Sequence, residues 1–234
     1  MALELDQIEA RAGAFVLSAD LTVAANQRVA IIGASGSGKS TLLDVIAGFR
    51  QPTSGAVRWL GQDITKLSPN QRSVSILFQD TNLFPHLTIR QNLALALNPA
   101  TGRLRAGDDD RIEASLTRVG LSGFADRHLS AMSGGQQSRA ALARVLLQDR
   151  SILLLDEPFA ALGPALKTEM LDLVAEVAAA EALTVLLVTH DPQDARRFAS
   201  HTIVVEAGQA MSPKDTEDLL NDPPEGLRAY LGEG

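Results

Sequence analysis

Hydrophobic and polar residues along the chain follow two periods, and each period predicts a different kind of element. Alternating or short continuous apolar runs predict strands at 3–8, 14–23, 28–32, 55–60, 74–78, 151–155, 184–188 and 202–205. A helical pattern covers 39–48, 89–97, 110–119, 136–147, 164–180, 192–199 and, more briefly, 216–220. The mixture of both element types predicts an α/β protein.

The order of these elements predicts how the chain is organised. In the second half, strands alternate with helices, which is typical of right-handed βαβ units and a mainly parallel sheet. The first short strands are expected to form an N-terminal antiparallel β subdomain, and the helical block at about 87–147 an inserted α-helical subdomain. Within that block, 98–110 is rich in Pro, Gly and Asp and is expected to be a surface loop. We therefore expect a single domain over 1–234.

Composition narrows the possible functions. A length of 234 residues with 45% hydrophobic residues supplies one large core. The formal net charge of −7 argues against a general nucleic-acid binder, so no nucleic-acid partner is expected. The absence of cysteine excludes disulfides and thiolate metal sites. No signal peptide is predicted, and the apolar runs are far shorter than the roughly 18 residues needed to cross a bilayer.

A glycine-rich segment joins the predicted strand 28–32 to the helix that follows it. Glycines let a backbone approach phosphates closely, and a helix start aims N–H groups at an anion. Lys39 is expected to reach the β and γ oxygens of a triphosphate, and the Ser40 hydroxyl to hold Mg²⁺. The alternative is a Gly/Ser-rich turn with a solvated lysine, and the flanking strand and helix argue against it. The phosphate-binding residues are expected to be Gly33, Ser35, Gly36, Ser37, Gly38, Lys39, Ser40 and Thr41.

Two carboxylates follow the predicted buried strand 151–155. Asp156 and Glu157 are therefore expected at the carboxyl edge of the sheet, where α/β proteins bind ligands. Asp156 suits Mg²⁺, which prefers oxygen ligands, and Glu157 is placed to polarise an attacking water. The pair could instead cap the next helix, but the phosphate-binding segment earlier in the chain favours the metal site.

Two further motifs point to the same site. The sequence Ser-Gly-Gly-Gln at 133–136 stands at the start of a predicted helix, whose N-terminus attracts anions. His190 follows the strand 184–188 and is expected at the same sheet edge as Glu157. A histidine at a strand end is more often a structural hydrogen-bonding group, but its place in this order of motifs favours a role in the site.

Together these motifs resemble those of the nucleotide-binding subunits of ATP-binding cassette (ABC) transporters, over nearly the whole chain. The resemblance implies a phosphate-loop NTPase core with ATP and Mg²⁺ as its ligands. It further implies that Gln79 senses Mg²⁺ and water, that Glu157 is the general base and that His190 contacts the γ-phosphate. The signature that distinguishes this family comprises Ser133, Gly134, Gly135 and Gln136.

The same resemblance implies partners and a location. Two cassettes are expected to form a homodimer head to tail on ATP binding, with each ATP between one phosphate loop and the signature of the other subunit. They are expected as peripheral subunits on the cytoplasmic face of the inner membrane, bound to integral-membrane permease subunits. A periplasmic or extracellular substrate-binding protein is an indirect partner.

The segment after Gln79 resembles that of bacterial importers, whose permeases dock a cytoplasmic helix beside it. We expect Leu83, Phe84 and His86 to contribute to that contact surface, although Leu83 and Phe84 could instead pack into the helical subdomain. The stretch 75–99 is most similar to ATP-binding subunits of thiamine importers, so the expected cargo is thiamine or its phosphates. Importers of iron and of other small molecules share most of these motifs and remain an alternative.

Two positions depart from the family pattern. Gly163 stands where the family usually has an aspartate near the dimer seam, so a non-hydrolysing regulatory cassette is an alternative function. Ala12 lies where the family commonly has an aromatic residue that stacks on adenine. Phe15 is the one nearby ring, and it either substitutes for that residue or leaves the base weakly stacked.

Overall fold

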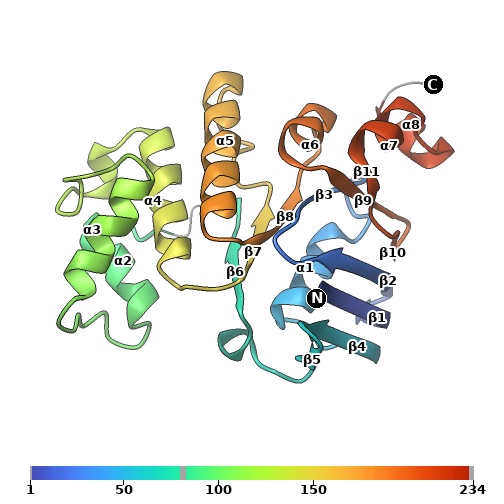
Figure 1. The fold of residues 1–234 in the computed structure, drawn as a ribbon, viewed down its shortest axis with the longest axis horizontal. Helices are drawn as coiled ribbons and strands as arrows, with labels where there is room; N and C mark the ends of the chain where they lie inside the picture. The colour runs from blue at the N-terminus through green and yellow to red at the C-terminus, as the bar shows by residue number, and fades with distance from the viewer. Residues whose placement is uncertain (1, 80–82, 232–234) are drawn as a thin grey trace.

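The computed structural model describes residues 2–79 and 83–231, and every structural statement below concerns those residues. It is built around one sheet with the strand order β5-β4-β1-β2-β10-β9-β3-β8-β7-β6, in which β11 also pairs with β9 (Figure 1). The strands are β1 (Ala2–Ala12), β2 (Phe15–Ala24), β3 (Arg28–Ile32), β4 (Ser54–Trp59), β5 (Gln62–Asp63), β6 (Val74–Leu77), β7 (Ile152–Asp156), β8 (Thr184–Val188), β9 (His201–Glu206), β10 (Gln209–Ala210) and β11 (Lys214–Asp215). The helices are α1 (Lys39–Ala47), α2 (Ile89–Leu97), α3 (Asp108–Arg118), α4 (Gly134–Leu146), α5 (Pro164–Ala180), α6 (Pro192–Phe198), α7 (Thr216–Asn221) and α8 (Glu225–Leu231).

The parallel part of the sheet runs from β9 through β3, β8 and β7 to β6. β3 lies between β8 and β9, so that Ala30 is opposite both Leu187 and Thr202. β7 likewise lies between β8 and β6. Residues of β7 and β8 are buried on both faces, which is why these strands have continuous apolar runs rather than alternation. The predicted α/β fold with a mainly parallel sheet is confirmed.

The antiparallel part of the sheet at the N-terminal side consists of β1, β2, β4 and β5. Buried and exposed residues alternate along β2, as the pattern predicts for a strand with one face against the core. β1 continues beyond the predicted end at Ile8 as far as Ala12. Gln7 has a φ of +47° and the register shifts between Leu5 and Ile8, so a β-bulge interrupts the alternation there. The bulge is the reason why the sequence pattern missed the second half of this strand.

The two faces of β3 build separate cores. Val29 and Ile31 point into a core that includes residues of α1 and of the antiparallel strands. Ala30 and Ile32 point into a core that includes residues of α5, α6 and the helices before β7. The sheet is therefore covered by α1 on one face and by α5 and α6 on the other, which places the ends of its parallel strands between two helical layers.

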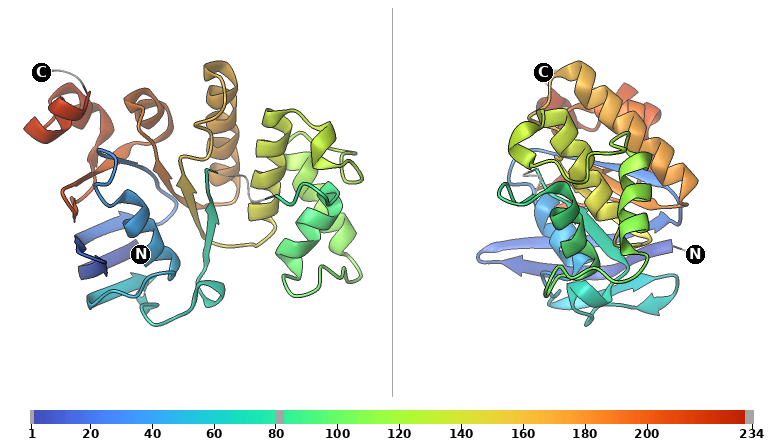
Figure 2. Two further views of the ribbon diagram at one scale, coloured as in Figure 1. Left: turned by 180° about the vertical axis from the view of Figure 1, so that it is seen from behind. Right: turned by 90° about the vertical axis from the view of Figure 1, so that its left-hand side faces the viewer.

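Helices α2, α3 and α4 lie together beyond β6, at the opposite end of the molecule from β1, β2 and β4 (Figure 1 and Figure 2). α3 begins at Asp108, inside the stretch expected to be a loop, because the Asp108 carboxylate accepts the N–H of Arg105. Acidic residues in the first turn of α3 stabilise the helix, because their negative charges lie at the positive end of its dipole. α4 begins at Gly134, two residues earlier than expected. The sequence pattern did not predict β5, β10, β11 and α8.

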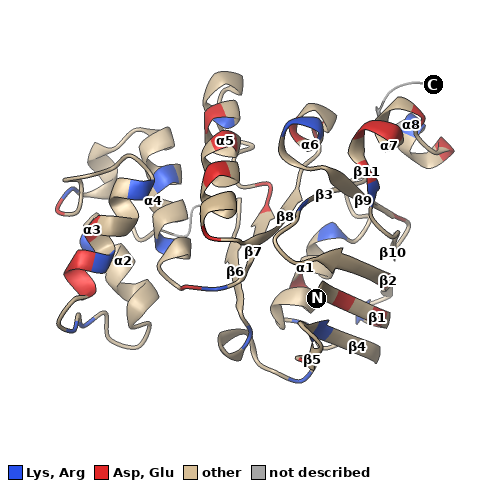
Figure 3. Cartoon of the chain, viewed as in Figure 1, with Lys and Arg blue, Asp and Glu red and all other residues tan. Residues whose placement is uncertain are grey.

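Charged side chains connect α5 to its neighbours α4 and α6. Acidic residues of α5 lie between basic residues of α4 and α6 (Figure 3). Glu169 of α5 pairs with Arg139 of α4, and Asp172 of α5 pairs with Arg197 of α6.

Among the described residues, no helix combines the length and the apolar character that crossing a membrane requires.

Candidate nucleotide-binding site

The segment between β3 and α1 forms a loop that only glycine permits at several positions. Gly33, Gly36 and Gly38 have φ angles of +153°, +76° and +115°. A Cβ on Gly33 would lie 2.1 Å from the carbonyl oxygen of Val205, so the backbone of β9 closes directly over this position. Gly38 is the N-cap of α1, so the free N–H groups of the helix start face the loop.

Lys39 points back into the concave side of this loop. Its Nζ donates to the carbonyl oxygens of Gly33 and Ala34 at 2.7 and 2.9 Å. Burial lowers the pKa of Lys39, and the negative charges of Glu157 and Asp156 offset part of that effect. The ammonium group is therefore positioned inside the loop, where phosphate oxygens could replace the carbonyls as its acceptors.

The loop also contains a buried serine. Ser37 Oγ has no hydrogen-bond partner among the residues that the structure describes. A Cβ on Gly33 would lie 2.9 Å from this oxygen and 2.1 Å from the carbonyl oxygen of Val205, so the Ser37 hydroxyl is on the side of the loop that faces β9. Ser37 is not among the described residues that line the cavity beside the loop. The N–H groups of the helix start and the Lys39 ammonium are the groups whose chemistry fits a phosphate.

The loop forms one wall of a cavity of about 670 Å³. Glu157 and His190 line the cavity opposite the loop residues, and Ala12 and Phe15 line it from β1 and β2. A Cβ on Gly38 would lie 2.8 Å from Cζ of Phe15, so the ring packs directly against the start of α1. Of the aromatic residues near the loop, Phe15 is the one that this cavity offers to a nucleobase.

The two carboxylates predicted at the sheet edge follow β7. Asp156 lies opposite Val188 of β8, with the side chain of Ser40 close enough to affect its pKa. Burial raises the pKa of Asp156, the Ser40 side chain lowers it, and the nearby Glu157 raises it further. The structure thus places two of the three expected Mg²⁺ ligands, both with oxygen donors, close to each other. Such a donor set fits Mg²⁺, which takes few protein ligands besides phosphates and water.

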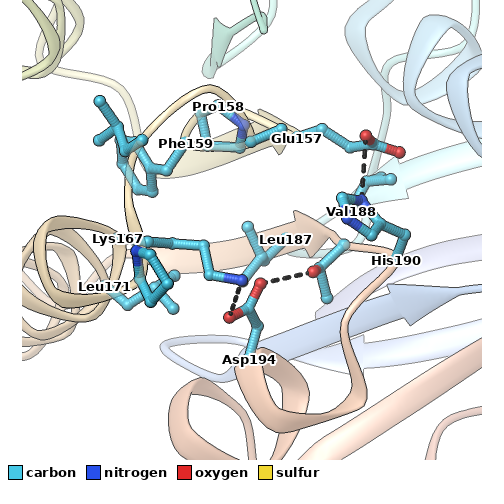
Figure 4. Close-up of a pocket in the computed structure, with 13 residues that line it drawn as sticks. Glu157, Pro158, Phe159, Lys167, Leu171, Leu187, Val188, His190 and Asp194 are labelled. Carbon is cyan, nitrogen blue, oxygen red and sulfur yellow. Dashed lines mark hydrogen bonds and ion pairs between the residues drawn. The ribbon is translucent and has the colours of Figure 1, made fainter. Parts of the chain in front are cut away.

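Glu157 and His190 meet at the mouth of the cavity. Glu157 has a φ of +46°, which non-glycine residues rarely adopt, and its N–H donates to the carbonyl of Val188. His190 Nδ1 lies 3.3 Å from Glu157 Oε2 (Figure 4). The histidine side chain is 61% exposed and the glutamate 29%, so the pair faces the cavity and not the core.

The predicted signature residues lie elsewhere in the chain. Ser133 caps α4, and its N–H donates to Gln136 Oε1 at 3.0 Å in a capping box. A Cβ on Gly135 would lie 2.6 Å from Cδ2 of Leu166, so α4 begins in tight contact with α5. Within the described chain, the residues that line the phosphate-loop cavity do not include 133–136. The start of α4 is therefore separate from the phosphate-loop cavity of its own chain.

Gln79 and the expected permease surface lie between β6 and α2. Gln79 is exposed after the end of β6, and it is not among the described residues that line the cavity. Residues 80–82, which begin the segment after Gln79, lie outside the described residues. Leu83 is buried in the core, so its predicted place on a contact surface is wrong, and it packs in the helical region instead. Phe84 is exposed, with its ring edge-on to that of His86.

The two departures from the family pattern have different structural settings. Gly163 is the N-cap of α5 and has ordinary extended backbone angles. A Cβ there would meet nothing within 4 Å, so neither backbone strain nor lack of space accounts for this glycine. Ala12 lines the cavity and leaves room beside Phe15.

Sequence reasoning missed a group of residues behind His190. Lys167 of α5 contacts Asp191 and Asp194 at the start of α6. The Asp-Pro pair at 191–192 is a recognisable helix-start signal. Nothing in the sequence connected it with Lys167, because the two lie on different helices.

Comparisons with known proteins agree with this geometry. Residues 16–160 match the protein family described as "ABC transporter". A thiamine import ATP-binding protein of Cereibacter sphaeroides is 59% identical over 98% of this chain and 99% of its own length. A protein of the same name from a Ruegeria species is 54% identical over the same shares.

Solved structures give the same result for the fold. A nucleotide-free ATP-binding cassette from an ABC transporter has a TM-score of 0.88 and 25% identity, covering 98% of this chain and 99% of that one. A dimeric post-hydrolysis cassette bound to ADP and Pi has a TM-score of 0.74 and 27% identity, covering 92% and 98%.

Proposed function

This chain belongs to the ABC transporter family, and from that premise we propose that it hydrolyses ATP to power import of thiamine or its phosphates. The observation that carries the reaction is the cavity in which Glu157 and His190 face the phosphate loop. The observation that carries the cargo is the near full-length similarity to thiamine import ATP-binding proteins.

The phosphate loop supplies most of the proposed nucleotide binding. Gly33 to Thr41 surround the triphosphate with backbone N–H groups and hydroxyls, and Lys39 moves its hydrogen bonds from loop carbonyls to the β and γ oxygens. Ser40 and Asp156, whose side chains lie close to each other, would hold Mg²⁺. Gln79, which follows β6, would supply the third ligand. Bound Mg²⁺ would neutralise charge on the phosphates, which is the main requirement of phosphoryl transfer.

Glu157 and His190 act on the other side of the γ-phosphate. Glu157 accepts a proton from, or orients, the attacking water, while His190 contacts the γ-phosphate. Their mutual contact supports this assignment, because it holds the carboxylate at the cavity mouth, where an in-line water has access.

We propose that the site is completed by a second copy of this chain. Ser133, Gly134, Gly135 and Gln136 at the start of α4 contact the nucleotide held by the partner, since they lie outside the cavity of their own chain. The dimeric, ADP-bound relative supports this arrangement. Separation and closure of the two copies would then follow ATP and ADP occupancy.

The proposed cassette works on the cytoplasmic face of the membrane with permease subunits. Phe84, exposed beside His86, is the residue we propose for the permease contact. A substrate-binding protein outside the membrane delivers the cargo to the permease and does not touch this chain.

ATP turnover tests the enzymatic part of this proposal. The full chain is assayed with and without Mg²⁺, beside the variants Glu157→Gln and Glu176→Gln. Glu176 is an exposed residue of α5 and serves as the matched control. Mg²⁺-dependent turnover that only Glu157→Gln abolishes supports hydrolysis at this site. Equal background rates in all three proteins would contradict it and favour a non-hydrolysing regulatory cassette, the alternative raised by Gly163.

Uptake of labelled thiamine tests the cargo. Cells that lack their own copy, with the permease confirmed present, receive the wild-type chain or Glu157→Gln. Restoration by the wild type alone supports thiamine import. No uptake with the wild type would contradict the cargo assignment and redirect the test to iron and other small molecules, while the ATPase assay would still stand.

A further inference from the structure

A second and smaller cavity of about 100 Å³ lies behind the wall formed by Glu157 and His190 (Figure 4). Lys167 reaches into it from the first turns of α5, and its side chain is only 20% exposed. Asp194 enters from the first turn of α6. A half-buried charge needs partners, and those partners determine what this lysine does.

The partners of Lys167 surround His190 in the sequence. Lys167 Nζ donates to Asp191 Oδ2 at 2.7 Å and lies 2.9 Å from Asp194 Oδ1. The other oxygen of Asp194 accepts a hydrogen bond from Thr189 Oγ1 at 2.7 Å. The residues on both sides of His190 are therefore tied to one ammonium group, Asp191 directly and Thr189 through Asp194.

We propose that Lys167 is a positioning residue for His190, a role that rests on the proposed function of the Glu157–His190 pair. The ammonium fixes the backbone on both sides of the histidine and so directs its ring at Glu157, 3.3 Å away. Lys167 is not among the described residues that line the phosphate-loop cavity, and its ion pairs are with Asp191 and Asp194.

The location of Lys167 on α5 adds a consequence for communication along the chain. Its neighbour Leu166 packs against Gly135 of α4: a Cβ on Gly135 would lie 2.6 Å from Cδ2 of Leu166. Two consecutive residues of α5 thus contact the start of α4 on one side and the His190 loop on the other. A displacement of 133–136 by a partner subunit would reach His190 through this turn of helix.

A purely structural role for Lys167 would be to join α5 to α6. The same two helices share another ion pair, in which Arg197 donates to both carboxylate oxygens of Asp172 at 2.8 and 2.6 Å. This pair is about half exposed and does not involve the His190 loop. Arg197→Gln is therefore a matched control that removes a tie between the same helices and leaves the histidine alone.

The kinetic test uses the full chain with Lys167→Met, Lys167→Arg and Arg197→Gln. Positioning predicts that Lys167→Met lowers kcat by about ten- to a hundredfold, the cost of a misplaced group, with the Kd for ATP within about twofold of wild type. Lys167→Arg restores most of kcat, and Arg197→Gln leaves it unchanged. In a His190→Ala background, Lys167→Met causes no further loss, because its effect acts through that ring. An equal loss in both backgrounds would overturn the proposal.

The second test observes His190 without turnover. The chain has 4 histidines, so its imidazole NMR spectrum is simple. Replacing each histidine by glutamine in turn assigns each imidazole signal to one residue. Lys167→Met, or Asp194→Asn if the first variant folds poorly, is expected to shift the His190 signals, whereas Arg197→Gln is not. An unchanged His190 spectrum in a folded variant would refute the positioning role. A wild-type chain that does not hydrolyse ATP would contradict the proposed function alone. The NMR spectra would still decide whether Lys167 positions His190.

Discussion

His190 Nδ1 lies 3.3 Å from Glu157 Oε2, although Glu157 follows the end of β7 and His190 follows the end of β8. The contact exists because β7 and β8 are parallel neighbours, so their carboxyl ends meet at one edge of the sheet. The contact restricts the orientation of both side chains, which is what the general-base role proposed for Glu157 would need.

Replacing His190 should therefore slow hydrolysis more than it weakens binding. We expect His190→Ala to lower kcat by about a hundredfold or more, within the range for a positioned acid–base group. The Kd for ATP should rise far less than kcat falls, because His190→Ala removes one contact to the γ-phosphate while the phosphate loop, which supplies most of the binding, stays intact. Steady-state kinetics and nucleotide titration measure both, with His128→Ala, an exposed histidine elsewhere, as control. Equal activity of the two variants would remove His190 from the mechanism.

Phe15 should contribute to binding of the base. Stacking on an aromatic ring is worth about 1–3 kcal/mol per base, so Phe15→Ala should raise the Kd for ATP by roughly five- to 150-fold. Phe15→Tyr retains the ring and should bind normally. Because Phe15 also packs on Gly38, tripolyphosphate binding separates the two effects: a base contact leaves it unchanged, and a distorted loop weakens it as well.

The phosphate loop should tolerate a methyl group at one glycine and not at another. Gly33→Ala would place Cβ 2.1 Å from the backbone oxygen of Val205, which cannot move without shifting β9. At Gly36 a Cβ meets nothing within 4 Å and adds only the cost of positive φ, about 1–2 kcal/mol. We expect Gly33→Ala to be less stable than Gly36→Ala by about 1–3 kcal/mol in urea unfolding. Equal stability of the two variants would show that β9 can move away from Gly33 at little cost.

A buried arginine should stabilise the end of α1. Arg72 is fully buried, and its guanidinium donates hydrogen bonds to backbone carbonyl oxygens. We expect Arg72→Met to lower the free energy of unfolding by about 2–5 kcal/mol, and Arg72→Lys to recover little because an ammonium cannot span the same acceptors. Arg58→Gln, which removes an exposed ion pair, should cost under about 1 kcal/mol in the same urea titration. The acceptors of Arg72 are the carbonyls of Val45, Ile46, Thr65 and Leu67.

The Lys167–Asp191 contact should stabilise the protein over a defined pH range. Burial alone would raise the pKa of Asp191, but hydrogen bonds from Lys167 and the Gln193 N–H lower it below the ordinary 3.8. Its contribution is therefore complete above that value and is lost as the pH falls through the lower pKa of the folded state. For Lys167 the effects have the opposite sign. Burial lowers its pKa, but its hydrogen bonds to Asp191 and Asp194 raise the pKa above 10.5 overall. That contribution is complete below 10.5 and is lost as the pH rises through the folded value.

Urea midpoints of wild type and Lys167→Met measure this range. The difference between them should be largest near neutral pH and should shrink in acid as Asp191 becomes protonated. A difference that stays constant down to pH values well below the ordinary pKa of Asp191 would show that packing, and not charge, accounts for the effect of Lys167.

The fold and much of the site could be predicted because the relevant information is local. The loop Gly33–Thr41 needs only glycines with positive φ, a strand before it and a helix after it, all within one short stretch. The strands β7 and β8 are continuous apolar runs that end at Asp156 and Val188, so the sheet edge could be inferred from the order of elements. The bulge at Gln7 hid half of β1, since it breaks the alternation on which the pattern depends.

By itself the sequence determined the α/β architecture and the phosphate-binding chemistry, because periodicity and loop glycines act between near neighbours. Only the tertiary structure decided that Leu83 is buried while Phe84 is exposed, and that Phe15 lies against Gly38. It alone also joined Lys167 to Asp191. These contacts depend on how helices from distant parts of the chain pack on the two faces of the sheet, and no residue spacing encodes that packing.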